Sequence, residues 1–158
     1  SPESLIEQIN AVVFRFLKKK KHMTGVFALL TPETGEVQLI STGHIPSYLV
    51  RVTGDIEEVG KPGFPLGMRQ NLKFTEQRMV MNPGDTLVLY TDGIVEAVNW
   101  NNDQLGFDRW RLALRDLLTT AFDHDIFDRA VQLIQRHTGQ RPFQDDVTLL
   151  FLHRRPQS

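Results

Sequence analysis

The spacing of apolar and polar residues predicts that the chain begins with an amphipathic helix. Apolar residues recur at helical intervals from Leu5 to Leu17, and Ser1 and Pro2 are placed as cap and first-turn residues. The basic run Lys18–Lys21 follows directly. Cations are favoured at the C-terminal end of a helix, so we interpret this run as a solvated helix end and not as a binding patch.

Short strands are predicted for the next seventy or so residues. Val26–Thr31 and Glu36–Ser41 are joined by Pro32–Gly35, whose early proline and late glycine are typical of a hairpin turn. Pro83-Gly84-Asp85 marks a later turn, in which Asp85 is interpreted as a turn residue. Further strands are expected at Tyr48–Val52, Ile56–Val59, Phe74–Met81 and Thr86–Thr91.

Two amphipathic helices and a last strand are predicted for the remainder. The first helix has its apolar face at Phe107, Trp110, Leu114, Leu117 and Leu118, and the second has it at Ile126, Phe127, Ala130, Val131 and Ile134. Trp110 and Phe107 are interpreted as core anchors, Gly139 as the end of the second helix, and Val147–His153 as the final strand. This order predicts an α+β fold with mainly antiparallel sheet.

Composition narrows the classes of function. The 158 residues suffice for one domain with a real core, and the net charge of −1 gives no sign of nucleic-acid or membrane binding. The chain has no cysteine, which excludes disulfides and thiol catalysis. No apolar stretch reaches the ~20 residues of a membrane span, and the first residues lack a signal-peptide core. We therefore expect a cytoplasmic domain with no membrane contact.

Candidate chemistry lies at the ends of two apolar runs. Leu87–Tyr90 leads through Thr91 to Asp92-Gly93, and Asp145-Asp146 leads into Val147–Leu150. A carboxylate beside a buried strand is costly unless it is paired, hydrogen-bonded or bound to a metal. Two such ends side by side would form an oxygen-rich site suited to a hard cation. We therefore expect the two strands to be neighbours, with both carboxylates at the same edge of the sheet.

These motifs resemble the PPM family of metal-dependent protein serine/threonine phosphatases, in its bacterial SpoIIE-like branch. The resemblance extends from about Leu5 to Leu152 and corresponds to the C-terminal two-thirds of that domain. Five motifs carry it in order: Thr42-Gly43-His44-Ile45-Pro46, Pro65-Leu66-Gly67, Pro83-Gly84-Asp85, Tyr90–Ala97 and Gln144–Thr148.

The resemblance implies an αββα sandwich with a metal centre at one end. Asp92 and Asp145 match two metal-binding aspartates of the family, and Asp146 matches a secondary position that varies. The complete domain would hold two Mn²⁺ or Mg²⁺ ions, which activate water for phosphate hydrolysis without a protein nucleophile. Gly93 is expected to present Asp92 through a tight turn at positive φ. His44 is expected to support the site by ordering its loop.

The chain also departs from the family pattern. The family's bridging aspartate motif and its Gly-His-Gly helix start, both upstream of the first helix, are absent from this sequence. Residues 1–158 are therefore interpreted as a single partial phosphatase domain, the C-terminal module of a longer signalling protein. We expect weak or no metal binding and no activity by this chain alone, and dimerisation through its first helix.

Two functions remain open from the sequence. The first is dephosphorylation of a phosphoserine- or phosphothreonine-bearing regulatory protein, which in this branch is typically an anti-sigma-factor antagonist. The second is a non-catalytic regulatory or dimerisation module on the same fold. Asp92 and Asp145 favour the first for the parent protein, and the missing upstream aspartate favours inactivity of the isolated chain.

Overall fold

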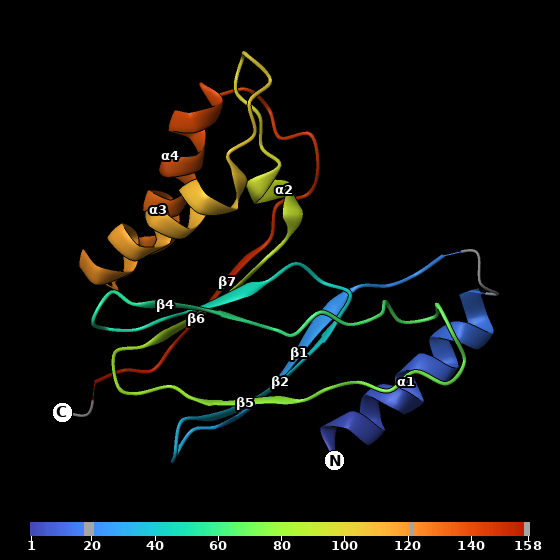
Figure 1. Cartoon of the computed structure of the whole chain (residues 1–158). Coiled ribbons are helices and arrows are strands. Elements are labelled where there is room, and N and C mark those ends of the chain that lie inside the picture. The colour runs from blue at the N-terminus through green and yellow to red at the C-terminus, as the bar shows by residue number, and fades with distance from the viewer. Residues whose placement is uncertain (18–20, 121, 157–158) are drawn as a thin grey trace. The chain divides into compact units, whose positions relative to one another are not determined.

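The structure, a computed structural model, describes residues 1–17, 21–120 and 122–156. The described chain forms two compact units, each built from two segments of the sequence (Figure 1). The predicted lysine-rich helix end falls largely outside the described residues. Among the described helices, none combines the length and the apolar character that crossing a bilayer requires.

The first unit comprises Ser1–Pro46 and Glu58–Met81, and its described residues form one helix and one sheet. Its elements are α1 (Pro2–Leu17), β1 (Gly25–Thr31), β2 (Glu36–Thr42) and β5 (Gln77–Val80). The sheet has the order β1-β2-β5 and both pairings are antiparallel. The predicted hairpin between β1 and β2 is confirmed, because Thr31 pairs with Glu36 across a turn in which Gly35 has a φ of 75°.

The core of this unit forms between α1, β2 and the loop before β5. Ile6 of α1 packs with four buried side chains, Ile40, Leu66, Leu72 and Phe74. The predicted apolar stripe of the helix is only partly buried, since Leu5, Val12 and Phe16 are exposed. Leu5, Val12 and Phe16 therefore leave an apolar strip of α1 uncovered in this structure.

A buried asparagine joins α1 to the loop that follows Pro65. The Asn10 side chain is 1% exposed, and its amide nitrogen donates to the carbonyls of Arg69 and Gln70 at 3.0 Å each. Its amide oxygen accepts a hydrogen bond from the Gly67 N–H at 2.9 Å. The side chain is thus well satisfied by backbone groups, as a buried amide must be. We call this set of contacts the Asn10 clamp.

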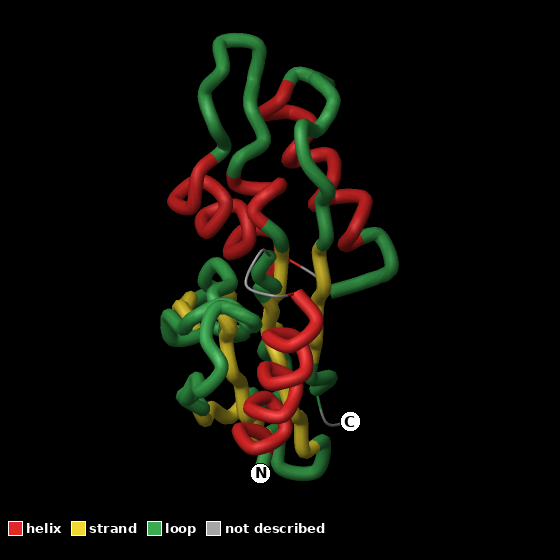
Figure 2. Tube along the Cα trace, turned by 90° about the vertical axis from the view of Figure 1, so that its right-hand side faces the viewer, coloured by secondary structure: helices red, strands yellow, loops and turns green. Residues whose placement is uncertain are grey.

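The second unit comprises Ser47–Glu57 and Asn82–Ser158 and carries the other sheet. The sheet has the order β4-β3-β6-β7 and brings together strands β3 (Ser47–Val50), β4 (Ile56–Val59), β6 (Thr86–Tyr90) and β7 (Leu149–His153). The helices are α2 (Asp92–Val95), α3 (Gly106–Thr120) and α4 (Ile126–Thr138). Figure 2 shows the three helices and the long loops of this unit gathered at one end of β6 and β7.

Aromatic stacking fills the core between this sheet and α3. Tyr48 stacks on Tyr90 with ring centroids 5.8 Å apart, and Tyr90 meets the edge of Trp110 at the same distance. Trp110 is fully buried, which confirms it as a core anchor. Phe107 is 44% exposed, so the same expectation for Phe107 was wrong. It lies in the first turn of α3, one residue after Gly106, where the helix has only begun.

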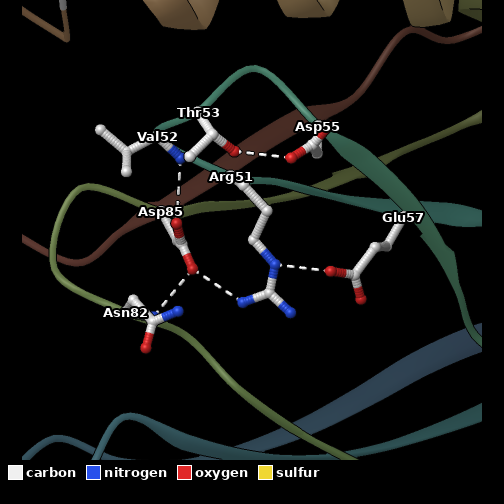
Figure 3. A network of polar contacts seen from close by, with 7 residues as sticks. All are labelled: Arg51, Val52, Thr53, Asp55, Glu57, Asn82 and Asp85. Atoms are coloured by element: carbon white, nitrogen blue, oxygen red, sulfur yellow. Dashed lines mark hydrogen bonds and ion pairs between the residues drawn. The ribbon is translucent and has the colours of Figure 1, made fainter.

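The turn before β6 carries a buried carboxylate (Figure 3). Asp85 is 1% exposed; its Oδ2 accepts from the Arg51 guanidinium and the Asn82 N–H at 2.8 Å each, and its Oδ1 accepts from the Val52 N–H at 3.0 Å. Arg51 also binds Glu57 at 2.6 Å. Hydrogen bonding to Glu57, and then to Asp85, raises the pKa of Arg51, so the guanidinium stays protonated. Asp85 is therefore a turn residue, as predicted, that also ties the β3–β4 hairpin to the turn before β6.

The α+β class with two antiparallel sheets is confirmed, and most predicted elements are present. The last helix ends at Gly139 in the left-handed conformation, as expected. Several strand boundaries differ: β5 begins at Gln77 and β7 at Leu149, later than the sequence pattern indicated, and β3 ends at Val50, earlier than expected. The short helix α2 was not predicted, because four residues are too few to show a helical period.

Candidate active site at the Asp92 and Asp145 edge

Asp92 stands where β6 ends and α2 begins. Thr91 is the residue before the helix and is extended, with φ −91° and ψ 159°, and Asp92 is the first helical residue. The Asp92 carbonyl accepts a hydrogen bond from the Glu96 N–H at 2.8 Å. The chain therefore turns sharply at this point, and the side chain of Asp92 is exposed at the end of the strand.

The neighbouring strand brings the second acidic motif to the same edge. β6 and β7 pair antiparallel, with Tyr90 opposite Leu149, so the residues after β6 lie beside the residues before β7. Thr91 extends this pairing: its N–H donates to the Thr148 carbonyl at 3.1 Å, and its hydroxyl accepts from the Thr148 N–H at 2.9 Å. The predicted neighbourhood of the two strands, with both acidic motifs at one edge, is confirmed.

Gly93 is required at this edge for a different reason from the one predicted. Its φ is not positive, because it is a residue of helix α2. A Cβ at this position would lie 2.6 Å from the carbonyl oxygen of Asp146, far inside van der Waals contact. The Thr91 hydroxyl also donates to that oxygen, at 3.1 Å. Glycine thus permits close packing of α2 against the Asp145-Asp146 segment, and the positive-φ expectation was wrong.

The carboxylates of Asp92, Asp145 and Asp146 are all exposed. One Asp145 oxygen accepts a hydrogen bond from the Asp146 N–H at 2.8 Å, which fixes the local turn. We expected the strand-end carboxylates to be buried and to need one another, or a metal, to offset the cost of losing water. That expectation was wrong for this chain, because water reaches the carboxylates and there is no cost of burial to offset. Their position at one edge, and not their burial, is what distinguishes them.

The donor atoms suit a hard cation in kind but not in number. Carboxylate oxygens are preferred by Mg²⁺ and Mn²⁺, which take about six ligands, some of them water. Among the described residues, however, no group of three or more acidic or histidine side chains is arranged to hold a metal ion. Asp92 and Asp145, with Asp146 beside them, can therefore form at most part of a metal centre, and the metal roles of all three remain predictions.

His44 belongs to the first unit and orders its own loop. Its Nδ1 lies 3.0 Å from the Ile45 carbonyl, which can only accept, so Nδ1 carries the proton in this arrangement. Gly43 before it has a φ of 71°, and a Cβ there would lie 2.6 Å from Cγ of Pro65. This bond agrees with an ordering role for the histidine, and its support of the active site stays a prediction.

Comparison with known proteins identifies the family. Residues 1–155 match the family described as stage II sporulation protein E (SpoIIE). The chain belongs to the SpoIIE family. Its members include protein serine phosphatases.

Two curated relatives and one solved structure show how far the likeness of this SpoIIE-family chain extends. Protein IcfG of Synechocystis is 27% identical over 133 residues, which cover 83% of this chain and 20% of IcfG. Phosphoserine phosphatase RsbU of Bacillus subtilis is 23% identical over 98% of this chain and 45% of RsbU. The chain thus spans less than half the length of either relative.

The solved structure of the RsbU and RsbW domains of Rv1364c from Mycobacterium tuberculosis supports the fold. It aligns with the whole of this SpoIIE-family chain at a TM-score of 0.79 and 24% sequence identity, and the match covers 43% of that chain. At this identity the likeness establishes the fold and not the activity.

One contributor to the site was missed by reasoning from sequence. Thr91 connects the two acidic motifs through three hydrogen bonds, to Thr148 and Asp146. The available signal was a hydroxyl residue between a buried strand and an aspartate, which is also what an ordinary helix cap looks like. Only the pairing with β7 distinguishes the two roles.

Proposed function

We propose that this chain is the C-terminal part of a metal-dependent phosphoserine and phosphothreonine protein phosphatase domain within a longer signalling protein. The observation that carries the proposal is the single edge at which Thr91 holds the Asp92 turn against the Asp145-Asp146 segment. Membership of the SpoIIE family and the name of its relative RsbU support the reaction class. The substrate would be a phosphorylated bacterial regulatory protein of the anti-sigma-factor-antagonist type, met in the cytoplasm.

The residues of this chain would supply two roles. Asp92 and Asp145 would each offer a carboxylate oxygen to a divalent cation, with Asp146 as a weaker third donor. Thr91 and Gly93 would hold those carboxylates in register by fixing the two backbones against each other. A pair of Mn²⁺ or Mg²⁺ ions, when bound, supplies an activated water and neutralises charge on the phosphate. Further ligands from outside this chain would complete the set.

The proposal is tested by hydrolysis of 4-nitrophenyl phosphate with Mn²⁺ by this chain and by a form extended upstream. We expect turnover by the extended form and none by this chain. Asp92→Asn should abolish that turnover with the far-ultraviolet circular dichroism unchanged, because it removes a ligand charge and little volume. Asp108→Asn on α3, also exposed, is the matched control and should keep wild-type turnover.

Calorimetry with Mn²⁺ gives a second test. Two carboxylates are a poor site for a cation that keeps its waters, so this chain should bind Mn²⁺ weakly or not at all, and the extended form tightly. Normal turnover by folded Asp92→Asn in the extended form would refute the metal role. Tight binding by this chain would refute the incomplete site.

A second candidate function is a non-catalytic dimerisation module, and one observation favours it. Leu5, Val12 and Phe16 form the exposed apolar strip on α1, and β1 is an edge strand in the described sheet. Exposed apolar strips and open edges both invite pairing with another chain. Light scattering on the wild type and on Phe16→Glu decides the matter: a dimer that the charge converts to a monomer supports this candidate, and a wild-type monomer contradicts it.

A further inference from the structure

A tryptophan stands exposed on the loop that follows α2. The loop closes as a hairpin, with Val98 bridged to Gln104 and the Leu105 N–H donating to the Ala97 carbonyl at 2.9 Å. It projects beyond α2 as the yellow segment in Figure 1. Trp100, within this loop, is 70% exposed. A side chain of this size normally contributes to folding by being buried, so its exposure calls for an explanation.

The indole is nevertheless held in one place. Its Nε1–H donates to the Gly139 carbonyl at 3.1 Å, and the Arg141 guanidinium carbon lies 5.8 Å from the ring centroid. A Cβ on Gly139 would lie 2.9 Å from Cδ1 of the indole, so glycine at the end of α4 also makes room for the ring. The tryptophan is therefore seated on the end of α4 with much of its surface facing water.

The loop that carries it is also fixed. Arg141 donates from one nitrogen to the Asn99 carbonyl and to Oδ1 of Asn102, both at 2.8 Å. The Asn99 side-chain oxygen accepts from the Asn101 and Asp103 N–H groups at 2.9 and 3.0 Å. A partner that contacts Trp100 would therefore meet a side chain that needs little further ordering, which lowers the entropic cost of binding.

The same segments lead directly to the candidate active site. Asp92 opens α2, immediately before this loop, and Arg141 precedes Asp145 by only a short stretch of chain. Gly93 joins the two by packing against Asp146. The loop and the acidic edge are thus joined within one unit, through α2 and its close approach to Asp146.

We infer that Trp100 is a docking residue for the polypeptide that flanks the phosphoserine of a protein substrate, and that it receives an apolar side chain of that substrate. The inference rests on the proposed function, because it assumes that a phosphoserine is presented to the Asp92 and Asp145 edge. Rigid, exposed aromatic residues are the usual anchors of protein recognition.

The test uses the upstream-extended form and three substrates: 4-nitrophenyl phosphate, and two short phosphoserine peptides that differ only in having leucine or glycine on both sides of the phosphoserine. Trp100→Ala should lower the ratio of kcat/KM for the leucine peptide to that for 4-nitrophenyl phosphate by about tenfold, the size of a typical anchor residue. It should also abolish the preference for leucine over glycine.

Phe127→Ala is the matched control. Phe127 is another exposed aromatic of this unit, near the opposite end of α4 and roughly 18 Å along the helix from Gly139. Its substitution should leave both ratios at the wild-type value. Trp100→Phe keeps an aromatic face without the indole N–H, and should retain part of the leucine preference.

A binding measurement on this chain separates the inference from the proposed function. Acrylamide quenches exposed Trp100 and not buried Trp110, so the leucine peptide should protect the quenchable fluorescence and the glycine peptide should not. No protection, or an equal loss of kcat/KM on all three substrates in Trp100→Ala, overturns the inference. So does a Trp100 already shielded in the extended form, which would make a segment of the same protein the occupant. Absence of turnover on every substrate refutes the proposed function, and the quenching result still decides the docking role.

Discussion

Replacing Asp85 with alanine should destabilise the second unit more than any other change of a polar side chain discussed above. The substitution leaves the N–H groups of Val52 and Asn82 without their carboxylate acceptor, and leaves Arg51 with Glu57. Hydrogen bonds to a charged group contribute about 1.5–3 kcal/mol each, and breaking a buried ion pair costs about 3–5 kcal/mol. Because the Arg51 side chain is 20% exposed and keeps its ion pair with Glu57, we expect the free energy of unfolding to fall by about 3 kcal/mol.

Urea unfolding followed by tryptophan fluorescence is the appropriate assay, because Trp100 and Trp110 both belong to the unit that contains Asp85. With a urea slope of about 2 kcal/mol per molar, the midpoint should fall by roughly 1.5 M. Asp85→Asn keeps the side-chain volume and one acceptor oxygen, so its unfolding midpoint should lie between those of Asp85→Ala and the wild type.

The control for this prediction is Glu57→Gln. The Glu57 side chain is 50% exposed, and exposed ion pairs contribute about 0–1 kcal/mol, so the midpoint should move by less than about 0.5 M. If Asp85→Ala shifts the midpoint no more than Glu57→Gln does, then the buried network does not hold the hairpin to the turn, and the reasoning fails.

Three further predictions concern the same unit and the candidate site. Gly93→Ala should lower the free energy of unfolding by about 1–3 kcal/mol and shift the Asp146 amide resonance, whereas Gly25→Ala, which meets only ordinary contacts, should do neither. Thr91→Val should lower the free energy of unfolding by about 1–2 kcal/mol, because it removes the hydrogen bonds of the hydroxyl to Asp146 and Thr148 and keeps the volume; an unchanged midpoint of denaturation would contradict the connecting role of Thr91. Partial burial, and then the charge of Arg155, lower the pKa of His153. Its contribution to stability is therefore present above about pH 6.5 and is lost as the pH falls toward the lower folded-state value. His153→Gln should reduce this loss of stability, measured by denaturation at pH 7.5 and at pH 5.5.

The elements that the sequence could predict are those whose pattern is local. The β1–β2 hairpin was predicted from Pro32 and Gly35, which both lie in the short turn between the paired residues Thr31 and Glu36. The ends of β6 and β7 were placed as neighbours because an acidic residue at the end of each apolar run was expected to need help against the cost of burial. The strands are neighbours, although the carboxylates are exposed. The edge itself could therefore be anticipated, together with Asp92 and Asp145.

What the sequence could not supply are contacts between distant segments. Gly93 was assigned to a turn because the carbonyl of Asp146, more than fifty residues away, cannot be seen in the local pattern. Asp85 gave only a turn signal, since its partner Arg51 comes from another hairpin. Phe107 had the right period for the core, but the pattern does not reveal that α3 begins just before it.

The Asn10 clamp also makes hydrogen exchange at one backbone amide a measure of the movement of α1. The Gly67 N–H has its acceptor on α1, so deuterium can replace its proton only when the helix lifts away from the loop or the whole unit unfolds. Its exchange rate, measured beside that of a strand amide such as Leu39, therefore reports how often α1 separates from the rest of its unit. A ligand, a partner chain or an upstream segment that binds the exposed strip of α1 would therefore change the exchange rate of the Gly67 amide.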